Sequence, residues 1–208
     1  MLSVEERRTL EDEVRALCER ADLDAAVARV LRGYGPEVYG LLVALHRGEQ
    51  DAAEVFSLWS EDLWKGLPGF AWRSSLRTWC YVLARHASHR YRESPPTPHL
   101  PLSQASEVTR LAAQVRTETG SFLEPRKRDW FTEMRASLPP EDQELLVLHI
   151  DRELAWEEVA AVMLDEGAAQ DDAALRRESA RLRKRFQLLK EKLIETGRRA
   201  GMLGRKGS

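Results

Sequence analysis

The chain is organised around the stretch from Lys65 to Arg92, KGLPGFAWRSSLRTWCYVLARHASHRYR. This stretch contains no Asp or Glu, although the whole chain has a formal net charge of -2. Its cations alternate with the aromatic residues Phe70, Trp72, Trp79, Tyr81 and Tyr91. Cations attract phosphates, and flat aromatic faces stack on unpaired bases. The stretch therefore predicts a surface for single-stranded or melting nucleic acid.

Around this stretch, apolar residues recur at helical spacing and predict an all-α chain. In the first half we expect helices over residues 4–19, 24–32, 36–47, 51–64 and 75–92. Asp24 is the expected N-cap of the second helix, Gly33 its end, and Pro36 the first turn of the third. We interpret Trp59 and Trp64 as core residues rather than partner contacts.

The helix expected after the Leu67-Pro68-Gly69 loop, capped by Ser74 or Ser75, has two faces. One face is an apolar stripe that packs into the core. The other is a basic stripe whose arginines have no acidic residue at i±4, which favours a functional surface over an ordinary solvated face. Its members are Arg77, Tyr81, Arg85, His89 and Arg92.

A proline-rich segment, SPPTPHLPL at 94–102, separates the two halves of the chain, because four prolines forbid a helix there. We place a first domain at 1–92, a linker at 93–124 and a second domain at 125–208. In the second domain, helices are expected from Pro125, from Pro140, around Trp156–Met163 and over 174–195. The last two, joined by the turn 164–172, form a helix-turn-helix candidate with a basic second helix.

Enzymatic chemistry has little support in the sequence, and we expect no catalytic residues, cofactor or metal. Gly66–Gly69 is not followed by the Lys-Ser/Thr of a phosphate-binding loop. Cys80, His86 and His89 lack the further ligands that zinc requires. No apolar run reaches the ~20 residues of a membrane span. With no signal-peptide pattern and two distant cysteines, we expect a cytoplasmic protein.

Three segments resemble a known family. GLPGFAWRSSLRTWCYVLARHASHRYR at 66–92 resembles the second conserved region of bacterial sigma-70 RNA polymerase sigma factors of the small extracytoplasmic-function (ECF) type. LPPEDQELLVLHIDRELAWEEVAAVM at 138–163 resembles the start of their fourth conserved region, and RLRKRF at 181–186 its basic closing helix. The order and spacing also agree with the family.

The resemblance implies a promoter-specificity subunit that binds core RNA polymerase, through its β′ clamp helices and β flap, and promoter DNA; an anti-sigma factor is a further possible partner. The −10 element would be captured and melted by Phe70, Trp72, Arg73, Ser74, Arg77, Trp79, Arg85, His89 and Arg92. For Trp79, the sequence agrees equally with contact to DNA and with packing in the core. The clamp helices would bind Asp51, Glu54, Val55, Leu58, Glu61 and Asp62.

In the second domain, the resemblance implies that the helix beginning near Ala173 enters the major groove of the −35 element. Arg176 and Arg177 would read bases, and Arg181, Arg183, Lys184 and Arg185 would contact DNA, chiefly phosphates. Two departures from the family pattern stand out. The clamp-binding helix reads Glu54-Val55-Phe56-Ser57-Leu58 in place of acidic-Val-Val-Gln-Glu, and Ser179 replaces a large apolar residue.

Two other functions agree with the same residues. A stand-alone helix-turn-helix regulator would bind duplex DNA without polymerase. A helical interaction protein would use its basic faces to bind an acidic partner. Binding to core polymerase distinguishes the sigma-factor hypothesis from both.

Overall fold

The computed structural model describes residues 2–46, 48–93, 137–164 and 171–199, together with Gln114, Met134 and Arg135. All regular secondary structure within these residues is helical, which confirms the all-α prediction. The chain divides into two compact units, Met1–Phe131 and Thr132–Ser208. The expected linker lies outside the described residues except for Glu93 and Gln114, as do the expected helix start at Pro125 and most of the 164–172 turn.

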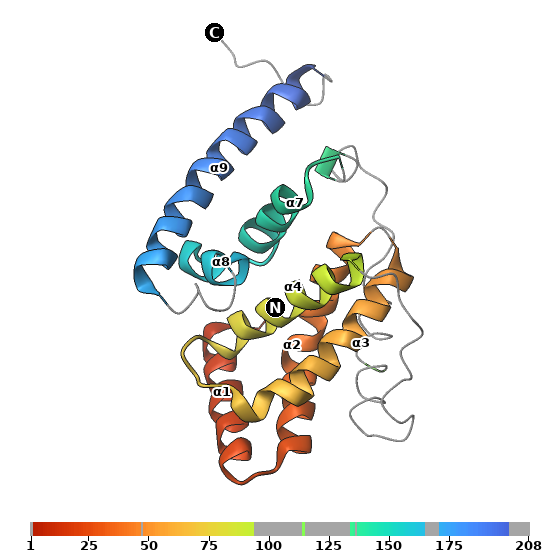
Figure 1. Cartoon of the computed structure of the whole chain (residues 1–208), viewed down its shortest axis with the longest axis vertical. Coiled ribbons are helices and arrows are strands. Elements are labelled where there is room, and N and C mark those ends of the chain that lie inside the picture. Colours follow the sequence, from red (N-terminus) through yellow and green to blue (C-terminus); the bar gives the residue numbers. More distant parts are fainter. Residues whose placement is uncertain are drawn as a thin grey trace. The chain divides into compact units, whose positions relative to one another are not determined.

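The first unit contains α1 (Val4–Glu19), α2 (Leu23–Leu45), α3 (Glu49–Gly66), the short 3₁₀ helix η1 (Leu67–Gly69) and α4 (Leu76–Glu93). The long helix α2 packs against α1, α3 and α4, and α3 also packs against α4 (Figure 1). The loop between η1 and α4 is therefore the stretch where the motif segment leaves helical structure, and its neighbours in space come from this bundle.

Capping side chains define where these helices begin. Ser3 and Glu6 form a capping box at the start of α1. Asp22, not the expected Asp24, caps α2 by accepting the N–H of Ala25. Ser75 Oγ accepts the N–H of Thr78 at 3.0 Å, which confirms the expected serine cap before α4.

Helix α2 is continuous, so the prediction that it ends at Gly33 and restarts at Pro36 is wrong. An internal proline removes one helical hydrogen bond and costs about 3 kcal/mol. Gly33 has a different role from a helix end: a Cβ at this position would lie 2.0 Å from Leu10 Cδ1 of α1. The glycine serves the close packing of α1 on α2 instead of ending the helix, and that packing stabilises α2 as one rod.

The core of the first unit is aromatic and aliphatic. Trp59 is 0% exposed and its Nε1 donates to the carbonyl of Cys80 at 3.1 Å, which confirms its interpretation as a core residue. Trp64 is 42% exposed, so the same interpretation is wrong for it. Its indole Nε1 donates to Asp24 Oδ1 at 3.4 Å across the ends of α3 and α2.

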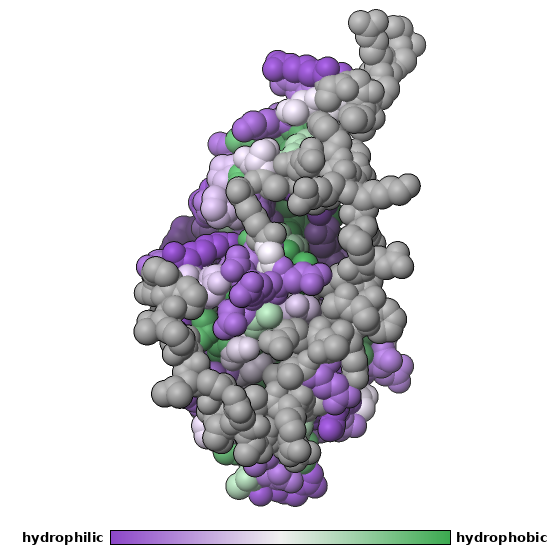
Figure 2. Space-filling model, turned by 90° about the vertical axis from the view of Figure 1, so that its right-hand side faces the viewer, coloured by the Kyte–Doolittle hydropathy of each residue, from purple (hydrophilic) through white to green (hydrophobic). Residues whose placement is uncertain are grey.

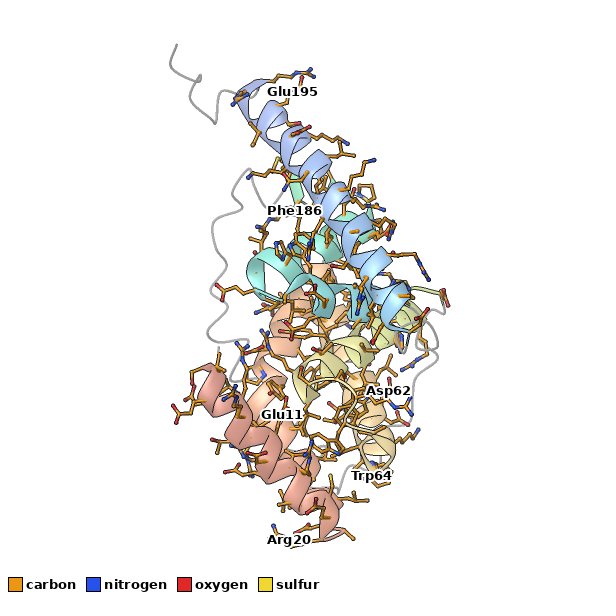
Figure 3. The ribbon with its side chains drawn as sticks, turned by 90° about the vertical axis from the view of Figure 1, so that its left-hand side faces the viewer. Glu11, Arg20, Asp62, Trp64, Phe186 and Glu195 are labelled. Carbon is orange, nitrogen blue, oxygen red and sulfur yellow. The ribbon has the colours of Figure 1, made fainter. Side chains whose placement is uncertain are left out.

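The second unit contains α7 (Pro140–Leu146), the π-helical turn η2 (Val147–Asp151), α8 (Trp156–Met163) and α9 (Asp172–Arg199). Helix α9 packs against both α7 and α8. The apolar residues at helical spacing along 174–195 form a seam on α9. Leu182 and Leu189 are buried, and Phe186, labelled in Figure 3, and Leu193 pack against the cluster that contains Leu189. Ser179 is 3% exposed, and its hydroxyl has no hydrogen-bond partner in the described part of the chain.

The surface of the described residues is mainly hydrophilic on the face shown in Figure 2, where hydrophobic atoms show only between polar ones. None of the described helices combines the length and apolar character that crossing a membrane requires.

Candidate nucleic-acid interface

Three aromatic rings meet where η1 gives way to α4. Phe70 stacks on Trp79, with 4.6 Å between ring centroids and 23° between planes. Phe70 also meets Trp72, at 4.9 Å and 51°. All three rings are partly exposed. These separations are typical of attractive aromatic pairs. We call Phe70, Trp72 and Trp79 the aromatic cluster, and it offers ring surface to solvent on which a further flat group can stack.

Backbone geometry holds the cluster in place. Trp72 has a φ of 57°, a left-handed conformation that costs free energy for a residue with a side chain. Gly66 lies directly beneath Trp79: a Cβ there would stand 3.1 Å from Trp79 Cζ2. Trp79 thus packs across Gly66 while one part of its ring stays accessible, so core packing and surface contact are both present in this residue.

Helix α1 reaches the same loop, which the sequence did not indicate. The guanidinium carbon of Arg15 lies 4.6 Å from the Trp72 ring centroid. Glu11, one turn earlier (Figure 3), accepts the N–H of Leu76 at 2.9 Å and so satisfies a donor at the start of α4. Burial raises the pKa of Glu11, against the opposing effect of the α4 N–H groups. The i, i+4 spacing of Glu11 and Arg15 places both on one face of α1, but the sequence has no signal for what that face contacts.

The candidate base-capture residues lie together. Phe70, Trp72, Arg73 and Ser74 lie within five positions of one loop, and Arg73 and Ser74 are exposed. Ser74 Oγ donates to the carbonyl of Ser75 at 3.4 Å. This loop therefore combines exposed ring surface with a cation and a hydroxyl.

Arg77 corrects the predicted basic stripe. Its side chain is 3% exposed, and its Nε donates to Glu37 Oε2 of α2 at 2.9 Å. Tyr81, also buried, donates its hydroxyl to the same oxygen at 3.0 Å. The expectation that Arg77 and Tyr81 lie on an exposed stripe is wrong, because both side chains are buried against an acidic partner from another helix. Spacing along α4 alone could not reveal that partner.

The rest of the stripe remains nearer the surface. Arg85 and His89 are half-buried and Arg92 is exposed. Arg92 donates from Nη2 to the carbonyl of Leu45 at 3.3 Å. Arg90, outside the stripe, pairs with Asp62 of α3. Several of the cations in this segment thus form ion pairs or hydrogen bonds with acceptors within the first unit.

The residues assigned to the clamp-binding face of α3 divide into three groups. Val55 is 0% exposed, so its assignment to an exposed face is wrong: it faces the core. Glu54 is exposed and Leu58 is half-buried. The remaining acids have partners inside the unit.

Those partners are specific. Asp51 accepts the hydroxyl of Tyr91 at 2.7 Å, and this hydrogen bond raises the pKa of Tyr91 to about 12. Glu61 pairs with Lys65, and Asp62 pairs with Arg90 as described above. A protein partner at this face would therefore meet charge pairs more than isolated carboxylates.

In the second unit, the two candidate base readers lie at the start of α9. Arg176 and Arg177 are both exposed. Arg177 lies 3.7 Å from Asp171, a weak contact between side chains that are 73% and 57% exposed. Exposed pairs of this kind contribute little to stability. Both arginines are accessible to a partner that approaches the first turns of α9.

Two of the arginines assigned to DNA contact also join helices within the second unit. Arg181 donates to Glu178 and to Glu141 of α7, and Arg185 donates to Glu141 and Asp142. The hydrogen bond with Glu178 is the main cause of a raised pKa at Arg181. We call these five residues the α7–α9 clasp. The clasp thus joins the acidic residues in the first turn of α7 to basic residues in the middle of α9.

The last two basic candidates differ in surroundings. Arg183 lies 3.4 Å from Glu157 and 6.0 Å above the Trp156 ring. Lys184 is exposed, and the described residues offer it no ion pair. Trp156 in turn contacts His149, with 3.8 Å between centroids, and both meet Phe186. This small aromatic group ties η2, α8 and α9 together.

Within the ranges that the structure describes, no group of three His, Cys, Asp or Glu side chains is arranged to hold a metal ion. No family model, curated protein or solved structure matches this chain.

Proposed function

We propose that this chain is a promoter-specificity subunit of bacterial RNA polymerase, a sigma factor of the ECF type. One observation carries the proposal: the aromatic cluster lies in the motif segment GLPGFAWRSSLRTW and is partly exposed on a strained loop. A set of rings that served only the core would be expected to be buried, as Trp59 is.

In the proposed mechanism, the first unit captures an unpaired base of the −10 element. Unstacking a base costs a few kcal/mol, and stacking on an aromatic side chain returns about 1–3 kcal/mol per base. One ring therefore offsets much of the cost of one flipped base. Arg73 and Ser74 supply a cation and a hydroxyl in the same loop, so the captured nucleotide can be held by its base and by its backbone.

The second unit would read the −35 element as a duplex. A basic helix that enters the major groove presents the side chains of its first turns to base edges, and Arg176 and Arg177 occupy these turns of α9. An arginine can bond O6 and N7 of guanine together. Arg181, Arg183, Lys184 and Arg185 are the candidate phosphate contacts, and Arg181 and Arg185 also bind the acids of the clasp.

Transcription with purified core polymerase tests the proposal. We expect the full chain to direct initiation from a subset of a broad promoter library, and core polymerase alone to direct none. Trp72→Ala should reduce open-complex formation more than closed-complex binding. A chain that supports no promoter-dependent initiation from the library would contradict the proposal, and equal losses at both steps would contradict base capture by Trp72.

A stand-alone duplex-binding regulator is the second candidate function, favoured by the exposure of Arg176 and Arg177 at the start of a basic helix. It predicts sequence-specific binding to duplex DNA without polymerase. A gel-shift selection from random duplexes, repeated with and without core polymerase, distinguishes the two functions, because the sigma factor should select sequences only in the presence of polymerase.

A further inference from the structure

Helix α1 supplies the aromatic cluster with a cation that the motif segment does not contain. Arg15 lies over the ring of Trp72, at 4.6 Å from the guanidinium carbon to the centroid. Two contacts fix the helix that bears it: Val14 is 0% exposed in the core, and Glu11 accepts the N–H of Leu76. Arg15 is thus held at the edge of the cluster by the packing of α1.

The charge of Arg15 acts on Glu11, whose pKa it lowers against the effect of burial. The Arg15 side chain is exposed, and within the described residues no ion pair neutralises its charge. Other arginines of the first unit differ in this respect, since Arg77 is buried against Glu37 and Arg90 pairs with Asp62. Arg15 therefore keeps a cation available beside the partly exposed ring of Trp72, a residue whose backbone is strained at a φ of 57°.

A base and Arg15 would compete for the same surface. Phe70 meets Trp72 at 51°, which is not a stacked arrangement, while Arg15 lies over the ring. An exposed cation–π contact contributes about 0.5–1 kcal/mol, whereas base–aromatic stacking contributes about 1–3 kcal/mol. A base that stacks on this face of Trp72 would therefore displace Arg15 from the ring.

The displaced guanidinium stays close, because its backbone on α1 does not have to move. A base stacked on Trp72 carries a phosphate on each side, within the reach of a long arginine side chain. Guanidinium binds phosphate oxygens through two parallel hydrogen bonds. The exchange thus replaces a weak contact with a stronger one.

We propose that Arg15 is a phosphate-binding residue of the single-strand site: it covers Trp72 in the free protein and binds the phosphate next to the base that takes its place. This inference rests on the proposed function, since it requires the aromatic cluster to receive an unpaired base. It extends the site from the motif segment to the N-terminal helix and assigns that helix a role in binding nucleic acid.

The salt dependence of binding distinguishes an Arg15 that contacts phosphate from an Arg15 that only lies over the Trp72 ring. For single strands, log K falls with log[salt] with a slope of about -0.7 for each phosphate neutralised. The full chain would be titrated with a fluorescein-labelled single-stranded DNA 12-mer over a salt series. We expect Arg15→Gln to make the slope shallower by about 0.7 and Arg15→Lys to retain it.

Arg20→Gln is the matched control, because Arg20 lies on the same helix at its C-terminal end (Figure 3) and its loss changes the net charge equally. It should leave the slope unchanged. Thermal unfolding of each variant checks that the exposed substitutions leave the fold intact.

Each outcome decides one question. An unchanged slope for Arg15→Gln, or tighter binding with the slope unchanged, overturns the inference and makes Arg15 only a cover. If that happens while Trp72→Ala still abolishes binding, base capture by the aromatic cluster survives and only the role of Arg15 is lost. Failure of the unaltered chain to bind any single strand, with or without core polymerase, refutes both.

Discussion

The buried ion pair between Arg77 and Glu37 gives the sharpest prediction about what holds the first unit together. The side chains are 3% and 7% exposed, and Nε lies 2.9 Å from Oε2. Glu37→Gln removes the negative charge while keeping an oxygen that can accept from Arg77 and Tyr81. The substitution therefore tests the charge of Glu37 separately from its hydrogen bonds.

The expected cost follows from the geometry. At 2.9 Å, an effective dielectric constant of about 20 gives an attraction of about 6 kcal/mol. Part of this offsets the desolvation of both groups, and removal of one partner from a buried pair costs about 3–5 kcal/mol. Because glutamine keeps the hydrogen-bond acceptor, we expect Glu37→Gln to lower the free energy of unfolding of the first unit by about 3 kcal/mol.

Thiol labelling of Cys80 reads the stability of this unit alone. Cys80 is 1% exposed, so a reagent reaches it only when the surrounding structure opens. In a Cys18→Ser background, a loss of 3 kcal/mol should raise the labelling rate about 100-fold. This readout is unaffected by unfolding of the second unit, which contains no cysteine.

The control is the double substitution Glu37→Met with Arg77→Met. Replacing a buried pair with apolar side chains of similar size is commonly neutral or stabilising. We therefore expect labelling of Cys80 at about the rate of the unaltered chain. A single variant that labels less than tenfold faster, or a double variant as unstable as the single one, would refute the reasoning. If a stable double variant lost promoter melting, the result would indicate that Arg77 contacts DNA.

Three further predictions concern other sites. Burial raises the pKa of Glu141, but hydrogen bonds and charges from Arg181 and Arg185 outweigh this effect and lower the pKa below 4.5. The stabilising contribution of Glu141 is therefore present at neutral pH and is lost as pH falls below 4.5 through the folded value. Glu141→Gln should flatten acid unfolding of the second unit, measured by circular dichroism, and an unchanged profile would contradict this. Arg176→Ala should cost about 1–3 kcal/mol at one −35 position, and uniform weakening over a set of promoter variants would indicate a phosphate contact. In the native chain, Cys18 should react with a thiol reagent faster than Cys80, because burial raises the pKa of both thiols but only Cys80 is fully enclosed; equal rates would argue against the packing around Cys80.

Local signals in the sequence predicted local structure well. The amphipathic pattern over 4–19 corresponds to α1, and Ser75 caps α4 as its residue type indicates. The seam of α9 followed from apolar spacing alone. These features depend on residues a few positions apart, which is why periodicity and capping chemistry are sufficient to find them.

Features that depend on distant residues were missed or misread. The residue type of Gly33 predicts a helix end, but its role depends on Leu10 in another helix. The position of Arg77 on α4 predicts exposure to solvent, but its partner Glu37 lies 40 positions away. The sequence also does not show that Arg181 binds Glu141, which likewise lies 40 positions away. In each case the deciding group comes from a different helix, and no pattern along a single helix contains it.

The internal pairing changes how the segment Lys65–Arg92 would bind nucleic acid. Composition indicated a broadly cationic surface, but Lys65 pairs with Glu61, Arg77 with Glu37 and Arg90 with Asp62. Cations that already have carboxylate partners release few counterions from a nucleic acid, so the salt slope for a single strand should be shallow. Affinity would then depend on ring stacking, which changes little with salt, and on a few cations near the rings, such as Arg15. The aromatic cluster is therefore the part of this segment on which single-strand binding should depend most.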